Sequence, residues 1–426
     1  MTRLPGLKAL APVWSRVTNI VAKEARGAWI TDVNGRKWLD FTTGIAVCNT
    51  GHCHPRVVSA AQQQLSKIMH AQMNIVYSES AVKLAESLQD IMPDPSLNRF
   101  FFTNSGAEAI EAAVKLAKQV TKKNNIICFE NSFHGRTMGA LSMTASKNVY
   151  SRGGGQVPGI HFARFPRCSS SCRIPASSGE PCCWDPIDSV EDVLKTRSAP
   201  GDTAAILVEP IQGEGGYVLP PPGFFKKLRE LCDREGILLI LDEVQSGMGR
   251  TGSWFAIEQL DDIRPDIMVV AKGIASGLPL SVVCANGESL MDKWIPGSHG
   301  GTYGGNAVSC AAAVETINVL RDEKLLENAV ARGQQALDFM RVNKWAERFP
   351  LKDTRGLGLM IGIEFDPLLK GCAGKVTSAA LEDGLMLMTA GSRETIRLMP
   401  PLVLSEPDMS LALSIIEKSM SRVFKK

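Results

Sequence analysis

The middle of the chain alternates short apolar runs with helical patterns, and this alternation limits the possible folds more than any other feature. Strand-length apolar runs lie at residues 98–104, 125–131, 204–210, 236–244, 265–273 and 281–287. Helical patterns between them cover residues 106–121 and 222–236. Several runs lack polar alternation, as expected of strands that are covered on both faces. The pattern predicts an α/β fold with a mostly parallel sheet.

The two flanks differ from the middle. Strand and turn signals occupy residues 1–55, where Asn34-Gly35 is a dipeptide typical of a hairpin. One long helix is predicted over residues 311–340, followed by short strands and a last amphipathic helix from about residue 407. We therefore expect a large central domain, residues 56–315, beside a smaller α+β domain. Both ends of the chain build that smaller domain, through residues 1–55 and 316–426.

Charge and cysteine content exclude several classes of protein. A net charge of +3 over 426 residues is too weak to favour nucleic acid or an anionic membrane as a partner. The apolar runs have strand length, so no membrane-spanning helix is expected. The 11 cysteines are odd in number and scattered, which favours a reducing compartment over a disulfide framework. We expect a cytoplasmic protein; the mitochondrial matrix is the alternative, because no acidic residue precedes Glu24.

One irregular stretch, residues 166–187, is rich in serine, proline and cysteine and is interpreted as a surface loop. Its four cysteines raise the alternative of a zinc site, but their spacing is not the usual one. The same alternative at His52-Cys53-His54 is weaker, and no metal is predicted. The four cysteines are Cys168, Cys172, Cys182 and Cys183.

Ligands of parallel sheets collect at the carboxyl ends of the strands, so the residues after each run are the first candidates. Ser105 and Gly106 follow the first run and open a helix, where free backbone N–H groups favour an anion such as phosphate. The alternative is a simple capping box, because Ser105 and Glu108 have the required spacing.

Two further strand ends carry ionisable side chains that can take part in catalysis. Asp242 ends the run 236–244, where its carboxylate is placed to pair with a cationic ring nitrogen, bind a metal or cap a turn. Lys272 lies at the end of the run 265–273, where burial lowers an amine's pKa and favours Schiff-base formation. Phe133 adds a ring that can stack on a cofactor, while the adjacent His134 reads as a loop histidine. A phosphate cradle, an acid and a lysine on one sheet are the parts that pyridoxal phosphate needs.

These motifs resemble those of the class III aminotransferases, the ω-aminotransferase subgroup of fold-type I pyridoxal-phosphate enzymes, from about residue 18 to 420. Within that class the chain looks most like the 4-aminobutyrate aminotransferases. The resemblance implies a large domain with a seven-stranded, mostly parallel sheet covered by helices. It is carried by DFTTGIAVCNTGHCHP (40–55), TNSGAEAIEAAVKLA (103–117), SFHGRTMGALS (132–142), VEPIQGEGG (208–216), LILDEVQSGMGRTG (239–252), AKG (271–273), GGTYGGNAVSCAAA (300–313), RGLGLMIGIEF (355–365) and IRLMPPLV (396–403).

The resemblance also implies roles toward the cofactor. Lys272 would form the Schiff base and then act as the general base and acid of the proton shift, and Asp242 would keep the pyridinium nitrogen protonated. Ser105, Gly106 and Ala107 would bind the phosphate. The remaining cofactor contacts would be Phe133 and Val244 on the two ring faces, Gln245 at the ring hydroxyl oxygen, and Thr302 at the phosphate of the neighbouring subunit in a homodimer.

On the substrate side the resemblance implies two arginines and a switch. Arg397 would bind the α-carboxylate of glutamate or 2-oxoglutarate, because a guanidinium matches a carboxylate in shape and charge. Arg136 would bind the distal carboxylate. Glu214 would pair with Arg397 when the donor lacks an α-carboxylate and swing aside for glutamate. Ile45 stands where ornithine-specific members carry a tyrosine, which argues against ornithine as the donor.

The predicted reaction is transfer of the amino group of 4-aminobutyrate, or a similar ω-amino acid, to 2-oxoglutarate, giving succinate semialdehyde and glutamate. The alternatives are acetylornithine, β-alanine or 2,4-diaminobutyrate as the donor, and an aminomutase on the same fold. An aminomutase has no need of a switch that admits two unlike substrates. The choice of donor, and a dimer against a dimer of dimers, stay open at this point.

Overall fold

The structure is a computed structural model that describes residues 5–151, 156–167, 187–391 and 393–424. Its central sheet has seven strands in the order β4-β10-β9-β8-β7-β5-β6. Strand β10 runs antiparallel to β4 and β9, and the other neighbours are parallel. The strands are β4 (Arg99–Thr103), β5 (Asn125–Phe129), β6 (Ile160–Ala163), β7 (Thr203–Val208), β8 (Leu238–Asp242), β9 (Ile267–Val270) and β10 (Ser281–Ala285). The predicted α/β class with a mostly parallel sheet is confirmed.

Both faces of this sheet are buried, which explains the unbroken apolar runs. In β7 all six residues are buried: Ala205 and Leu207 belong to one hydrophobic cluster, Ile206 and Val208 to the other. Helix α4 (Gly106–Thr121) packs in the first cluster, and α7 (Phe224–Glu235) in the second. Each fully buried large side chain contributes about 1.5–3 kcal/mol. Polar groups in these strands are therefore confined to the ends.

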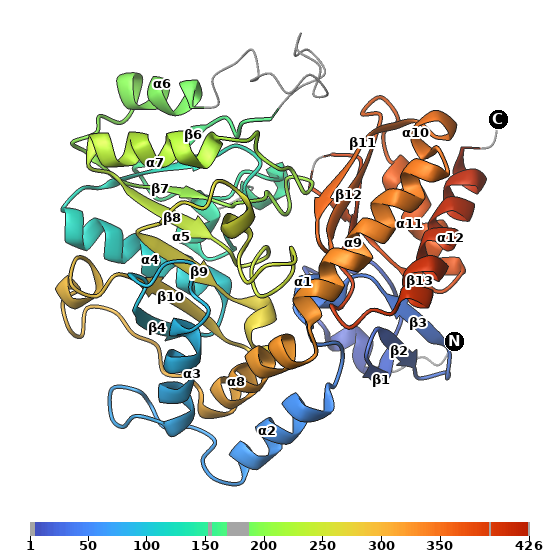
Figure 1. Cartoon of the computed structure of the whole chain (residues 1–426), viewed down its shortest axis with the longest axis horizontal. Helices are drawn as coiled ribbons and strands as arrows, with labels where there is room; N and C mark the ends of the chain where they lie inside the picture. The colour runs from blue at the N-terminus through green and yellow to red at the C-terminus, as the bar shows by residue number, and fades with distance from the viewer. Residues whose placement is uncertain (1–4, 152–155, 168–186, 392, 425–426) are drawn as a thin grey trace.

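The longer of the remaining helices around this sheet are α2 (Pro55–Leu65), α3 (Glu79–Gln89), α5 (Met138–Ser142), α6 (Asp188–Thr196) and α8 (Ala307–Asp322). Among them, α6 lies at the top of the view in Figure 1, and α2, α3 and α8 lie toward the bottom. Single turns of 3-10 helix also occur, at η1 (Pro5–Ala9), η2 (Asn148–Ser151), η4 (Ala256–Gln259), η5 (Lys272–Ala275) and η6 (Met291–Lys293).

Two smaller sheets stand beside the large one (Figure 1). The first has the order β1-β2-β3-β13 and the second β11-β12-β15-β14. Residue Leu385 of β13 pairs with Leu39 of β3, so the two ends of the chain share one sheet. The domain boundaries at residues 55/56 and 315/316 stay a prediction. The strands are β1 (Ala22–Arg26), β2 (Trp29–Asp32), β3 (Lys37–Asp40), β11 (Leu351–Leu357), β12 (Met360–Phe365), β13 (Leu385–Met386), β14 (Met388–Ala390) and β15 (Thr395–Leu398).

The hairpin predicted at Asn34-Gly35 is confirmed, because β2 and β3 pair antiparallel on either side of it. Asp32 closes the turn by accepting hydrogen bonds from the backbone N–H groups of Asn34 and Arg36, at 2.8 and 3.0 Å. Gly35 has φ +84°, which glycine adopts without strain.

The prediction of one long helix over residues 311–340 is wrong, because the chain breaks there into α8 and α9 (Leu325–Val342). Lys324 between them has φ +52°, a left-handed conformation that ends a right-handed helix. Helix α8 packs on α2 and α3, whereas α9 packs on α12 (Glu406–Val423) and β11. The break thus passes the chain from one region to the other. Two further helices complete the smaller region, α10 (Trp345–Arg348) and α11 (Cys372–Glu382).

The four cysteines of the irregular stretch lie outside the described residues. Among the described residues no cluster of three metal-ligating side chains occurs. The described helices include none that is both long and apolar enough to cross a membrane.

A turn of left-handed backbone follows β3. The four residues of α1 (Thr43–Ala46) have φ angles of +47°, +65°, +71° and +59° in order. For a branched residue such as Ile45 this conformation costs roughly 1–2 kcal/mol. Asp40 compensates by accepting from the backbone N–H groups of Thr42 and Thr43, at 2.8 and 3.1 Å, and from His52 Nε2 at 2.8 Å.

Replacing Gly44 with alanine tests this turn. A methyl group on Gly44 would meet nothing nearer than 4.0 Å, so backbone strain alone should lower the unfolding free energy, by about 1 kcal/mol. Gly374→Ala is the matched control: it lies inside α11, meets no atom within 4 Å and should stabilise by about 0.5–1 kcal/mol. Calorimetric melting of both variants measures the difference, and a shift of the same sign in both would contradict the strain.

Candidate active site

A cavity of about 440 Å³ opens at the carboxyl ends of the parallel strands. It brings together nine of the predicted residues: Ser105, Gly106, Ala107, Phe133, Arg136, Asp242, Val244, Gln245 and Lys272. They come from the loops that follow β4, β5, β8 and β9, four different strands. The volume suits a small organic ligand.

One end of the cavity is formed by the first turn of α4. Ser105 caps this helix, accepting from the backbone N–H of Glu108 at 3.3 Å. The N–H groups of Gly106 and Ala107 have no acceptor within the helix, because they belong to its first turn. A methyl group on Gly106 would come within 3.0 Å of Val244 Cγ1, so glycine is needed for this close approach. The capping interpretation is therefore confirmed, and the anion-binding interpretation, which is compatible with it, stays a prediction.

Asp242 lies deep in the cavity, 5% exposed. Its Oδ2 accepts from Nδ1 of His134 at 2.7 Å, and its Oδ1 accepts from the backbone N–H of Val244 at 3.1 Å. His134 is itself buried and lines the cavity. The interpretation of His134 as a loop histidine thus missed its function: it orients the carboxylate of Asp242.

Lys272 stands at the start of η5, directly after β9, with φ +47°. Burial lowers the pKa of the Lys272 amine, against the opposing influence of Asp242 and Glu214. A lowered pKa leaves more of the amine neutral and nucleophilic near neutral pH.

Gln245 and Phe133 define the sides of the cavity. The hydroxyl of Tyr217 donates to Gln245 Oε1 at 2.9 Å, which leaves the amide nitrogen of Gln245 as the donor. The Arg136 guanidinium lies 5.6 Å from the Phe133 ring and 5.3 Å from the Tyr150 ring. Among the described residues Arg136 forms no ion pair, so its charge is available to a carboxylate.

A buried ion pair stands near Lys272. The Arg397 guanidinium, 1% exposed, donates to Glu214 Oε1 at 2.5 Å, and Lys147 Nζ lies 3.7 Å from Glu214 Oε2. Burial alone would raise the pKa of Glu214, but Arg397 and Lys147 hold it below its usual value. Arg397 comes from β15, whereas Glu214 follows β7, so the pair joins the small β11–β15 sheet to the large sheet. Lys147 was not predicted from the sequence.

Four predicted residues do not line this cavity: Glu214 and Arg397, which form the buried ion pair beside it, and Ile45 and Thr302. Ile45 lies on the left-handed turn, two residues before the cavity-lining Val47. Thr302 is exposed, next to the exposed ring of Tyr303. Its position outside the cavity agrees with the expectation that it serves a neighbouring subunit, which stays a prediction.

Glu209 is a cavity residue that the sequence argument missed. It follows β7 directly, is 6% exposed and lines the cavity beside Asp242. Burial raises the pKa of Glu209 to about 7, and the charge of Asp242 raises it as well while His134 opposes. The rule that selected Asp242, a carboxylate at the end of an apolar run, applies equally to Glu209.

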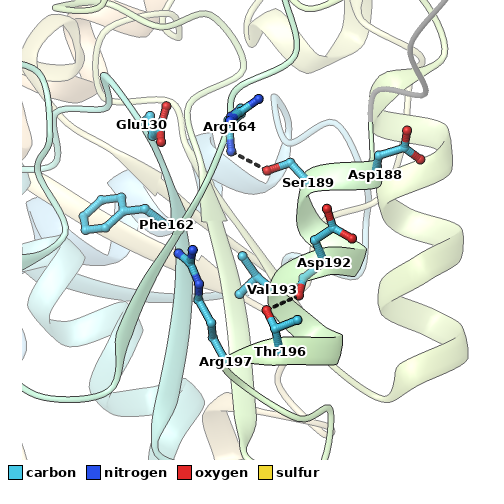
Figure 2. A pocket seen from close by; sticks show the side chains of 9 residues that line it. All are labelled: Glu130, Phe162, Arg164, Asp188, Ser189, Asp192, Val193, Thr196 and Arg197. Atoms are coloured by element: carbon cyan, nitrogen blue, oxygen red, sulfur yellow. Dashed lines mark hydrogen bonds between the residues drawn. The ribbon is translucent and has the colours of Figure 1, made fainter.

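A second cavity, of about 260 Å³, lies between β6 and α6 and shares no residue with the first (Figure 2). Its charged side chains, Glu130, Arg164, Asp188, Asp192 and Arg197, are all exposed to solvent. It contains none of the predicted site residues and has no buried reactive group.

Comparison with known proteins shows the family of this chain. The family model Aminotransferase class-III matches residues 10–420. The 4-aminobutyrate aminotransferase GabT of Escherichia coli is 39% identical over 94% of this chain and 93% of its own length. The 5-aminovalerate aminotransferase DavT of Pseudomonas putida is 39% identical, covering 95% and 94%. An acetylornithine aminotransferase of Methanothermobacter thermautotrophicus is 42% identical over 93% of each chain.

Solved structures agree in fold. A transaminase from the marine bacterium Virgibacillus has a TM-score of 0.89 at 28% identity, covering 98% of both chains. The ornithine aminotransferase of Toxoplasma gondii, described with pyridoxal phosphate at its active site, has a TM-score of 0.85 at 30% identity, covering 98% of this chain and 93% of its own. The chain therefore belongs to the class III aminotransferases, a family whose cofactor is pyridoxal phosphate.

Proposed function

We propose that this aminotransferase moves the amino group of 4-aminobutyrate, or a similar ω-amino acid, to 2-oxoglutarate, giving succinate semialdehyde and glutamate. The observation that carries the proposal is the buried ion pair of Arg397 and Glu214. While the pair is closed, the site offers no free cation there and suits a donor without an α-carboxylate. When Glu214 moves aside, Arg397 is free to bind the α-carboxylate of glutamate or 2-oxoglutarate.

The residues around the cavity fit pyridoxal phosphate. The glycine-dependent close approach at the start of α4 leaves backbone N–H groups for a phosphate, and Asp242 is held by His134 with its carboxylate in the cavity. When bound, this cofactor supplies an electron sink for the carbanion that forms on the amino substrate. Phe133, Val244 and Gln245 would hold the ring, with Asp242 keeping its nitrogen protonated.

The chain's own residues would do the remaining chemistry. Lys272 would hold the cofactor through its amine, and the same amine would take the proton from the substrate carbon and return it. Arg136, with Lys147 near the same Tyr150 ring, would bind the distal carboxylate of the donor. Ile45 and Val47 would form the wall on the donor side. A cytoplasmic location is part of the proposal.

The alternative donor is acetylornithine, since relatives named for it are as similar to this chain as those named for 4-aminobutyrate. A panel of 4-aminobutyrate, 5-aminovalerate, β-alanine, 2,4-diaminobutyrate and acetylornithine, each with 2-oxoglutarate, separates the donors by kcat/KM. A preference for acetylornithine would replace the proposed donor, and absence of glutamate with every donor would favour an aminomutase.

Lys272→Ala should reduce turnover by at least ~10³-fold, because one amine both attaches the cofactor and transfers the proton. Borohydride reduction should then leave no cofactor attached to the chain. Lys370→Ala, at an exposed lysine, is the control and should behave as wild type. Normal turnover in the Lys272 variant would overturn its role.

Glu214→Ala should lower kcat/KM for 4-aminobutyrate by about tenfold or more, because Arg397 then stays buried without a partner while that donor is bound. The value for glutamate should change little, since glutamate supplies the missing carboxylate. Steady-state kinetics with both donors measure the ratio of kcat/KM for 4-aminobutyrate to that for glutamate. The control is Glu130→Ala, which changes an exposed residue of the smaller cavity. Equal losses for both donors would contradict the switch.

We also propose that the enzyme is a homodimer with shared active sites. A surface of exposed apolar residues, Met69, Ile75, Tyr77 and Tyr303, supports this, because soluble monomers seldom expose such groups together. The backbone carbonyl of Met69 accepts from Asn306, and the His70 and Tyr303 rings lie 5.1 Å apart, so the segments that carry Met69 and Tyr303 are in contact. Thr302 is exposed beside Tyr303, and in the proposed dimer it would reach the cavity of the neighbouring subunit.

Tyr77→Asp should therefore convert the dimer to a monomer and weaken cofactor binding, because Thr302 of the neighbour is lost. Leu368→Asp is the control: Leu368 is 85% exposed, similar to Tyr77 at 82%, but belongs to a different segment. Sedimentation velocity and a cofactor titration measure both effects. A monomeric wild-type enzyme, or equal behaviour of the two variants, would refute the shared site.

A further inference from the structure

Two buried carboxylates stand side by side at the floor of the cavity. Strands β7 and β8 are parallel neighbours with Val208 opposite Leu241. The next residue of each strand is an acid, Glu209 and Asp242, and both line the cavity at 6% and 5% exposure. The proposed chemistry uses Asp242 but gives Glu209 no role.

The two oxygens of Glu209 join two different loops. Oε2 accepts from the backbone N–H of Phe133 at 3.1 Å, in the loop after β5. Oε1 accepts from the backbone N–H of Gly213 at 2.9 Å, in the loop after β7. The first loop carries the ring of Phe133 and the imidazole of His134. The second continues directly into Glu214.

The charge of Glu209 also acts on the cavity. It raises the pKa of Lys272, in the same direction as Asp242. Its own pKa, raised by burial to about 7, places its ionisation within the physiological range. Both backbone N–H groups donate to the carboxylate, and hydrogen bonds donated to the charged form oppose the rise in pKa that burial causes. The hydrogen bonds from the two loops therefore favour the ionised form of Glu209.

We propose that Glu209 is a positioning residue that fastens the cofactor-facing loop at Phe133 to the loop that carries Glu214. Its negative charge lies in the same cavity as Lys272. The part concerning Glu214 rests on the proposed function. The part concerning the cofactor needs only the family's cofactor. The carboxylate of Glu209 would thus affect both the position of the cofactor ring and the movement of Glu214 between the two substrates.

The test compares Glu209→Gln with Glu243→Gln. Gln keeps the size of Glu, but its NH₂ group faces an N–H donor, so one loop is released and the charge is lost. Glu243 is a close match: it is fully buried, it follows Asp242, and burial raises its pKa to about 7 as well. Its carboxylate, however, accepts from Ser246 and from the backbone N–H of Ile257, and it does not line the cavity.

Three measurements follow, and the first two need no amino donor. In Glu209→Gln the dissociation constant for pyridoxal phosphate should rise about tenfold, as expected for loss of a charged hydrogen bond. The pH midpoint of the bound cofactor's visible absorbance should move to lower pH, because a nearby negative charge no longer favours the protonated form. The ratio of kcat/KM for 4-aminobutyrate to that for glutamate should fall, because Glu214 is held less firmly against Arg397.

Glu209→Asp separates the two effects. It keeps the charge but is one methylene too short to reach both loops, so the absorbance midpoint should stay near that of wild type while cofactor affinity falls. Glu243→Gln should change neither the absorbance midpoint nor the cofactor affinity. The proposal is wrong if Glu209→Gln leaves both unchanged, or if Glu243→Gln changes them equally. A protein that binds the cofactor but does not transaminate ω-amino acids would refute the proposed donor and leave these two measurements interpretable.

Discussion

The burial of the central sheet on both faces is the constraint on which the rest of this structure depends. Strands β5, β7 and β8 have no solvent-facing side, so ionisable groups are placed where the strands end. Parallel strands end at one edge, and Asp242, Glu209 and the loop with His134 therefore converge there. Low dielectric at this edge strengthens each charge interaction and penalises each charge left unpaired. The burial of the sheet on both faces therefore determines both the fold and the position of its ionisable groups.

The second requirement is that the smaller region keep a fixed position relative to this edge of the sheet. Arg397 reaches Glu214 from β15, and a second buried arginine holds the same boundary. Arg250 is fully buried, donating to the backbone carbonyls of Leu359 and Pro400 and, at 2.7 Å, to Asn49 Oδ1. Burial lowers the pKa of Arg250 to about 10, because the described residues give it no carboxylate partner. Its planar fork contacts three segments at once, which the point charge of lysine does not do.

The sequence predicted the elements that depend on local pattern. Helix α4 has the predicted bounds, because its cap and its apolar stripe are both local signals. The break at Lys324 was missed, because the segments on both sides favour helix and only their different packing partners separate them. Strand β6 was missed, because it has four residues at the sheet edge. In the site, position at the end of an apolar run selected Lys272 and Asp242 and the motif resemblance assigned their roles, whereas Glu209 and His134 matter through hydrogen bonds between distant loops.

The pairing of β3 with β13 has a consequence for synthesis of the chain on the ribosome. Residue 39 is made early and its partner, residue 385, near the end. At roughly 5–20 residues per second the edge of β3 waits on the order of tens of seconds for its neighbour. The last strand of the large sheet, β10, is made at residue 285, about a hundred residues before the partner of β3, and until then β3 presents an open edge to other chains. Nascent chains on one messenger are therefore exposed to wrong pairing at this strand, and a chaperone that shields the first 40 residues would protect them.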